Sequence, residues 1–151
     1  MERDKIKQTN NFIVYTDGGS RGNPGPAAIG IVIDGPTGKK DYGEYIGVKT
    51  NNEAEYQAVI FALKKLKQLA GGDSAQKSSV LFYLDSELLV KQFNHEYKVK
   101  EENIQKLFLE VHNLRLDFGH VEFKHVLRGK NTNADKLVNQ VLDREANKLD
   151  L

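Results

Sequence analysis

The sequence predicts an α/β fold, with three antiparallel strands near the start of the chain followed by alternating strands and helices. In the first 50 residues, short apolar runs are bounded by glycine and proline, which is typical of strands joined by turns. Beyond them, segments with apolar residues three or four positions apart alternate with short apolar runs. Short connections favour antiparallel pairing of the early strands, and helical crossovers favour parallel pairing of the later ones.

The clearest predicted element is a helix over residues 51–70. An Asn is available as its N-cap, glutamates enrich its first turn, lysines enrich its last turn, and Gly71 and Gly72 end it. The run SVLFYL at residues 79–84 is apolar on both faces, as expected of a central buried strand. The predicted strands are 12–17, 27–35, 40–49, 79–84 and 120–127, and the predicted helices are 51–70, 86–94, 102–114 and 133–149.

The composition is that of an ordinary globular protein. The 151 residues suit one domain over residues 11–151, preceded by a polar tail at 1–10 that we expect to be mobile. The absence of cysteine excludes disulfides and thiolate metal sites, and no apolar run is long enough for a membrane span. We therefore expect a cytoplasmic monomer. With a net charge of +1, the protein would have to meet a nucleic-acid partner through a local patch.

Each of four carboxylates lies at one end of a predicted strand or helix, in line with the side of that element that is expected to be buried. Asp17 ends the first predicted strand, and Asp85 follows the most apolar strand. Glu55 lies four residues before the apolar stripe of the first helix, and Asp135 lies three residues before that of the last helix. If the two strands are neighbours and both helices pack on the sheet, the four side chains could meet at one edge.

Carboxylates held together must share a proton or a cation, because their charges repel. Oxygen ligands alone favour Mg²⁺ or Mn²⁺, with Ca²⁺ as a less suitable ion. Each acid also has an ordinary interpretation, since acids in a first helical turn stabilise the helix dipole and acids at strand ends form turns. The four histidines show no zinc-like spacing.

The glycine-rich stretch GSRGNPG, which follows Asp17, does not have the pattern of a phosphate-binding loop. It lacks the G-K-[ST] ending of a P-loop, and a strand follows it instead of a helix. The glycines instead allow a tight hairpin turn and keep the surface beside Asp17 low enough for a large substrate.

Four segments, in this order and spacing, resemble type 1 ribonuclease H: YTDGGSRGNPGPAAIG, TNNEAEYQAV, YLDSELLVKQFN and NTNADKLVN. The resemblance covers residues 13–140. It implies the ribonuclease H-like fold, a mixed five-stranded sheet flanked by helices, and cleavage of the RNA strand of RNA–DNA hybrids. The segment SELLVKQFNHEYKVK is followed directly by EENIQKL, as in the shorter members of the family, which lack the basic insertion. The hybrid-binding module that precedes some members is not expected here.

The resemblance assigns the family's metal-binding acids to Asp17, Glu55, Asp85 and Asp135. It implies two Mg²⁺ ions, with Mn²⁺ as a substitute, and in-line attack by water that leaves a 5′-phosphate and a 3′-hydroxyl. Asp17 is expected to contact both ions, Glu55 and Asp85 to complete one site, and Asp135 to complete the other.

The chain departs from the family pattern at two positions. Many members have a histidine in the loop before the last helix, whereas this chain has LRGKNTNAD. Arg128 is the candidate replacement; it cannot shuttle protons near neutral pH, but it can stabilise phosphate charge. The alternative is that Arg128 is a solvated loop charge. Glu87 stands where many members have glutamine, which puts that minor-groove contact in question.

Substrate contacts are predicted beside the acids, at positions that the family uses for sugar and phosphate. Each of these residues could instead be a turn or cap residue. The candidates are Gly18, Asn23, Thr50, Asn51, Asn52 and Glu87.

Duplex RNA is a second candidate substrate, beside the RNA–DNA hybrid. Two other functions remain as alternatives: another nuclease or strand transferase of the same fold, and a hybrid- or duplex-RNA-binding module with an inactive site. The glycine–asparagine loop argues against the first alternative, and the four intact acids argue against the second.

Overall fold

The computed structural model describes residues 11–149. The prediction of a mobile tail at residues 1–10 lies outside the described residues. In chain order the elements are β1 (Asn11–Ser20), β2 (Gly25–Gly35), β3 (Gly38–Lys49), α2 (Asn51–Ala70), α3 (Gly72–Ala75), β4 (Ser79–Leu84), α4 (Glu87–Phe93), α5 (Glu102–Arg115), β5 (His120–His125), the 3₁₀ turn η1 (Arg128–Lys130) and α6 (Thr132–Leu149).

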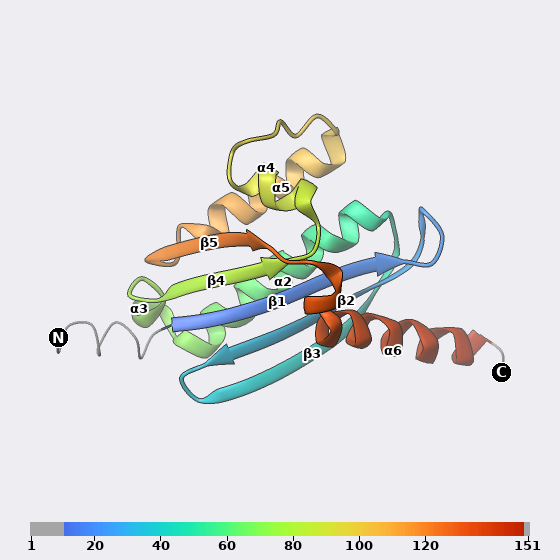
Figure 1. The fold of residues 1–151 in the computed structure, drawn as a ribbon, viewed down its shortest axis with the longest axis horizontal. Helices are drawn as coiled ribbons and strands as arrows, with labels where there is room; N and C mark the ends of the chain where they lie inside the picture. Colours follow the sequence, from blue (N-terminus) through green and yellow to red (C-terminus); the bar gives the residue numbers. More distant parts are fainter. Residues whose placement is uncertain (1–10, 150–151) are drawn as a thin grey trace.

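The strands form one mixed sheet in the order β3-β2-β1-β4-β5 (Figure 1). β1, β2 and β3 pair antiparallel as a meander, and β4 and β5 add to β1 in parallel. Tyr15 of β1 pairs with Val32 on one side and with Tyr83 on the other, which sets the register. The predicted fold class is therefore confirmed.

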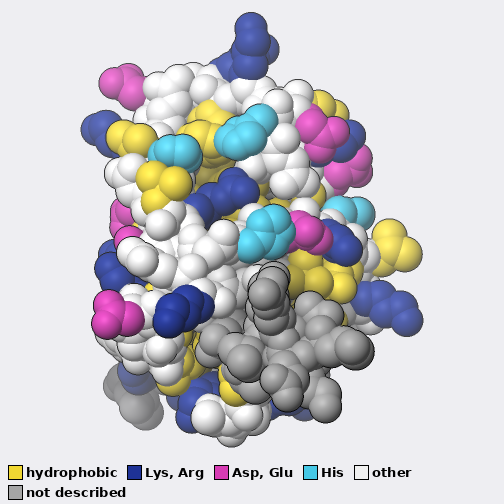
Figure 2. All heavy atoms as spheres, turned by 90° about the vertical axis from the view of Figure 1, so that its left-hand side faces the viewer, with side chains coloured by type: hydrophobic (Ala, Val, Ile, Leu, Met, Phe, Trp, Pro, Cys, Tyr) yellow, Lys and Arg dark blue, Asp and Glu magenta, His cyan; other side chains and the backbone are white. Residues whose placement is uncertain are grey.

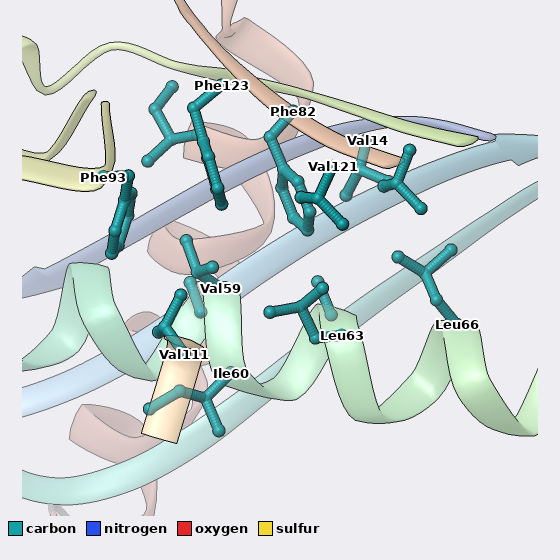
Figure 3. Close-up of a cluster of buried hydrophobic side chains, with 14 of the residues drawn as sticks. Val14, Val59, Ile60, Leu63, Leu66, Phe82, Phe93, Val111, Val121 and Phe123 are labelled. Atoms are coloured by element: carbon teal, nitrogen blue, oxygen red, sulfur yellow. The ribbon is translucent and has the colours of Figure 1, made fainter. Parts of the chain in front are cut away.

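The helices cover the two faces of the sheet unequally. Figure 1 shows α2 and α5 behind the sheet and α6 in front of it, over β2 and β3. The main core lies on the α2 side, where side chains such as Val59, Leu63 and Phe82 interlock (Figure 3). In front, α6 forms a separate small cluster, which consists of Ala28, Val138, Val141 and Leu142.

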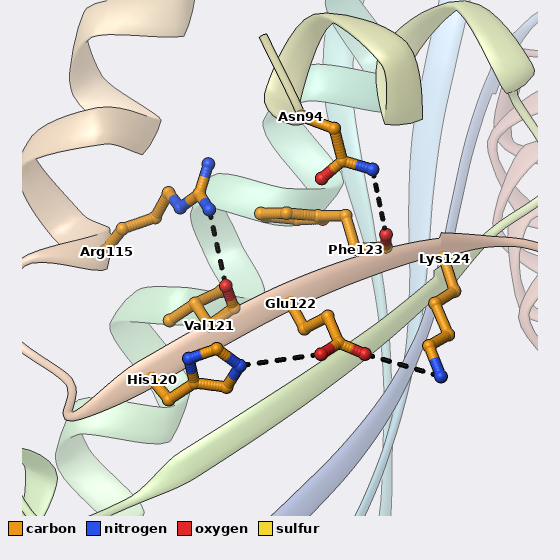
Figure 4. Close-up of polar contacts among 7 residues, drawn as sticks. All are labelled: Asn94, Arg115, His120, Val121, Glu122, Phe123 and Lys124. Carbon is orange, nitrogen blue, oxygen red and sulfur yellow. Dashed lines mark hydrogen bonds and ion pairs between the residues drawn. The ribbon is translucent and has the colours of Figure 1, made fainter. Parts of the chain in front are cut away.

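The half-buried guanidinium of Arg115 joins α4 and α5 to the sheet. Arg115 at the end of α5 donates to the backbone oxygens of Phe93 (2.8 Å) and Val121 (3.3 Å) and lies 4.9 Å from the centre of the Phe123 ring. Figure 4 shows this contact beside the exposed His120–Glu122–Lys124 row of β5. Arg115 thereby connects α4, α5 and β5, which follow one another in the chain.

The structure corrects several sequence predictions. β1 does not end at Asp17 but continues to Ser20, because its pairing with β2 extends to Ala27. β4 is fully buried on one face only, since no helix within residues 11–149 covers its front. The N-cap of α2 is Thr50 instead of an Asn, within a capping box completed by Glu53. The short α3 and η1 were not predicted. Among residues 11–149, no helix has the length and apolar character needed to cross a membrane.

Candidate active site

Two glycines bring the helices that carry Glu55 and Asp135 close to β1. A Cβ on Gly18 would lie 2.3 Å from the backbone of Ala54, and one on Gly30 would lie 2.2 Å from the backbone oxygen of Ala134. Since Gly30 is the β2 partner of Asp17, the first turn of α6 passes directly over the strand pair that holds this acid. The missing side chains thus let Glu55 and Asp135 approach Asp17 from opposite faces of the sheet.

Asp17 is the electrostatic centre of the group. Burial, followed by the charges of Asp85, Asp135 and Glu55, raises the pKa of Asp17 from 3.8 to about 8. The backbone N–H of Gly18 donates to its Oδ1 at 3.0 Å. Asp85, Asp135 and Glu55 thus all lie close enough to Asp17 to raise its pKa, which agrees with the prediction that the four carboxylates meet at one edge of the sheet.

Glu55 has one oxygen without a protein partner. Burial, together with the charge of Asp85, raises its pKa to about 7, while the Ser86 side chain and Arg128 act in the opposite direction. Its Oε2 is buried and makes no hydrogen bond. A buried oxygen of this kind is costly unless a proton or a cation satisfies it.

Asn131 is a site residue that the sequence analysis missed. Its side chain is 1% exposed, and Nδ2 donates to the backbone oxygen of Thr16 (2.9 Å) and to Asp85 Oδ2 (3.3 Å). It therefore fixes Asp85 against β1 from the turn that precedes α6. The available signal was its place four residues before Asp135, at the start of a helix.

The donor set fits a hard divalent cation in its chemistry. Four carboxylates with no sulfur or imidazole among them are the ligands that Mg²⁺ prefers. The unpartnered Glu55 Oε2 and the shared repulsion around Asp17 agree with a positive group between them. However, within residues 11–149 no three acidic, histidine or cysteine side chains already stand at ligand spacing, so the carboxylates must draw together to bind an ion.

The carboxylates line a surface hollow and not a deep cavity. Asp17, Glu55 and Asp85 border a shallow hollow with Ser86. A cleft of about 270 Å³, which includes Tyr15, Lys130 and Asn131 in its lining, lies further back on the sheet. A shallow, open site suits a wide duplex better than a small molecule that must be enclosed.

The glycine-rich loop docks on the start of α2 through two of the candidate residues, Asn23 and Asn51. Ser20 donates from its N–H and its hydroxyl to Asn51 Oδ1 (2.9 and 3.1 Å), and the N–H of Asn51 donates to Asn23 Oδ1 (3.1 Å). The Thr50 hydroxyl accepts from the N–H of Glu53, so its first function is to cap α2. Asn52 lines a groove of about 180 Å³ that also includes Lys98 and Lys100.

The other three candidates differ in their placement. Gly18 is buried and packs against the backbone of Ala54, and its contact with substrate remains a prediction. Glu87 is exposed and pairs with Lys91 at 2.9 Å. Arg128 is exposed in η1, near enough to Glu55 to lower the pKa of that carboxyl.

The opposite end of the sheet has a different character. Figure 2 shows that acidic and basic side chains are interspersed there among histidines and apolar groups.

Comparison with known proteins finds relatives along most of the chain. The model of the reverse transcriptase-like family matches residues 15–141. A bifunctional protein of Mycobacterium tuberculosis is 37% identical over 137 residues, which cover 89% of this chain and 36% of that protein. Ribonuclease HI of Halobacterium salinarum is 35% identical over 131 residues, which cover 85% of this chain and 63% of that enzyme. The chain thus spans less than two thirds of either relative.

Solved structures agree in fold. An RNase H1 isolated from compost by a metagenomic approach is 42% identical with a TM-score of 0.82, covering 91% of this chain and 99% of that one. A structure of that RNase H1 in complex with an RNA/DNA hybrid gives 40% identity and a TM-score of 0.83, covering 89% of this chain and 99% of that one.

The mixed sheet, with acids from two strands and two helices at one end, defines a ribonuclease H-like domain. The chain belongs to the type 1 ribonuclease H family, in the short form that lacks the basic insertion.

Proposed function

We propose that this chain is a metal-dependent endoribonuclease that hydrolyses the RNA strand of RNA–DNA hybrids and leaves 5′-phosphate and 3′-hydroxyl ends. The observation that carries the proposal is the convergence on Asp17 of three further carboxylates, which come from the residue after β4, from α2 and from α6. The hybrid bound by the related RNase H1 supports the choice of substrate.

Asp17, Glu55, Asp85 and Asp135 would hold the divalent cations. Two Mg²⁺ ions, with Mn²⁺ as a substitute, would supply a more nucleophilic water and stabilise the leaving 3′ oxygen. Asp17 suits contact with both ions because the other three acids surround it. Asn131 would keep Asp85 in place, and Arg128 would stabilise phosphate charge.

Recognition of RNA would rest on groups that can read the 2′-hydroxyl. Amide side chains suit a hydroxyl that both donates and accepts hydrogen bonds. Asn51 and Asn52 begin the helix that carries Glu55, and Asn23 accepts a hydrogen bond from the N–H of Asn51. Asn52→Ala should therefore reduce hybrid cleavage with little effect on metal affinity. Since the net charge is only +1, we expect weak binding that is lost readily as salt rises.

A gel assay with a labelled hybrid tests the proposal. We expect the hybrid to be cleaved with Mg²⁺ and to remain intact with a chelator. Duplex DNA of the same sequence should not be cleaved under either condition. Binding without cleavage would identify a binding module with an inactive site. Cleavage of duplex DNA would indicate another nuclease of this fold, and an arm with duplex RNA decides whether that substrate is also cut.

A second substrate tests how the sugar is read. In this hybrid, a few consecutive ribonucleotides are replaced by deoxyribonucleotides. Cutting should vanish across that patch and persist on either side, because only ribose carries the 2′-hydroxyl. Cleavage through the patch would contradict reading of this group. A monomeric state and a cytoplasmic location remain predictions from the sequence.

A further inference from the structure

The loop 20–25, which consists of the turn between β1 and β2 and the strand residue at each of its ends, contacts both helices that bring acids to the site. On one side it binds the first turn of α2 through Ser20, Asn23 and Asn51. On the other side, Arg21 reaches α6 with an ion pair to Asp143 Oδ1 at 2.7 Å and a hydrogen bond to Asn139 Oδ1 at 3.5 Å. The loop itself is closed by the N–H of Arg21, which donates to the backbone oxygen of Pro26 at 2.8 Å.

The contacts of Arg21 on α6 lie in line with a candidate metal ligand. Asp135, Asn139 and Asp143 are four residues apart, so they form one row along the helix. Asn139 also donates from Nδ2 to the backbone oxygen of Asp135 at 3.1 Å. The guanidinium therefore fastens the row that begins at Asp135 to the loop that follows Asp17.

This link matters because α2 and α6 lie on opposite faces of the sheet (Figure 1). Packing on the sheet fixes each helix separately, whereas loop 20–25 passes round the end of the sheet and contacts both. We propose that Arg21 is a positioning residue: it holds this loop against α6 and thereby sets the place of Asn23 and Asp135 relative to the acids of β1 and α2.

The exposure of the ion pair separates this role from a general stabilising one. The side chains of Arg21 and Asp143 are 44% and 65% exposed, and exposed pairs contribute little to the free energy of unfolding. Small displacements of catalytic groups, in contrast, have large effects on rate, with roughly a hundredfold loss for 1 Å. Loss of the pair should thus leave stability nearly unchanged and lower turnover.

The inference rests on the proposed nuclease activity. The test compares four variants with the wild type: Arg21→Ala, Asp143→Ala, the double alanine variant, and a charge-exchanged variant that carries both Arg21→Asp and Asp143→Arg. The expected result is a fall in kcat of about tenfold in each single variant, a similar fall in the double variant, and recovery in the exchanged pair. KM should change little. Lys148→Ala is the matched control, because it breaks another ion pair at the surface of α6, with Glu145 at 3.1 Å, and should leave kcat unchanged.

Amide hydrogen exchange supplies a readout that does not depend on activity. The amides of residues 20–25 should exchange faster in Arg21→Ala and in Asp143→Ala than in the wild type or in Lys148→Ala. A raised KM in Arg21→Ala, with Asp143→Ala unaffected, would mean that Arg21 binds substrate directly and would overturn the inference. Unchanged kcat and exchange in both variants would also overturn it. A wild type that does not cut hybrids refutes the proposed function instead, and exchange alone then decides the inference.

Discussion

Replacing Asp17 with Asn should abolish cleavage and raise the stability of the metal-free protein. The substitution keeps the size of the side chain and removes one ionisable group from a cluster of four acids. In the unfolded chain this carboxyl ionises near its ordinary pKa of 3.8, whereas in the folded protein burial and then the neighbouring carboxylates raise the pKa to about 8. Between these values the unfolded state binds fewer protons, so the free energy of unfolding falls as pH rises.

The size of the gain follows from this difference in pKa. About three pH units separate pH 7 from the pKa of 3.8 in the unfolded chain. At ~1.4 kcal/mol per unit, this interval sets an upper limit of about 4 kcal/mol on the gain in the free energy of unfolding. The carboxylates titrate together and share the repulsion, so we expect about 1–3 kcal/mol. For a domain of this size that gain raises Tm by roughly 3–10 °C.

Calorimetry in the presence of a chelator between pH 5 and 8 measures the effect. Asp17→Asn should exceed the wild type in Tm at pH 7–8, and the difference should shrink toward pH 5. Asp34→Asn, at an exposed position of β2, is the control and should stay within ~0.5 kcal/mol of the wild type. An unchanged or lowered Tm at pH 7–8, or a gain independent of pH, would refute the electrostatic reasoning.

Three further substitutions test other parts of the site. Asn131→Leu leaves the backbone oxygen of Thr16 without its donor and should lower the free energy of unfolding by about 1–3 kcal/mol in urea titrations. Thr50→Ala removes the capping box of α2 and should cost about 1 kcal/mol in the same measurement, with an unchanged m-value. Arg128→Ala should lower kcat more than it raises KM if the guanidinium acts at the phosphate; kinetics in which neither constant changes would identify a solvated loop charge.

Local signals in the sequence were sufficient for most of the fold. The bounds predicted for α2 and β4 agree with the structure, because the helix begins after a capping residue and ends at Gly71, and the strand is a short apolar run. The convergence of Asp17, Glu55, Asp85 and Asp135 was also predictable, since each acid continues the buried side of its element. Element order and side-chain periodicity are properties of neighbouring residues, and these residues are visible in the sequence.

Contacts between distant segments could not be predicted in the same way. Asn131 and Thr16 are 115 positions apart, and their hydrogen bond depends on how the turn before α6 crosses β1. The incomplete burial of the front of β4 depends on α6 covering β2 and β3 instead. The Arg21–Asp143 pair likewise joins two surface residues whose types alone do not single them out.

Because α6 packs outside the main core, the set of four carboxylates depends on a helix that is less enclosed than α2, the other helix of the site. Asp17, Glu55 and Asp85 are carried by elements that share the main core, whereas Asp135 is carried by a helix held chiefly by the small cluster around Val138 and Leu142. Segments with few buried apolar contacts open at a lower free energy than the rest of a domain. The fourth carboxylate is therefore the one that a local opening of the chain removes first, while the other three remain in place.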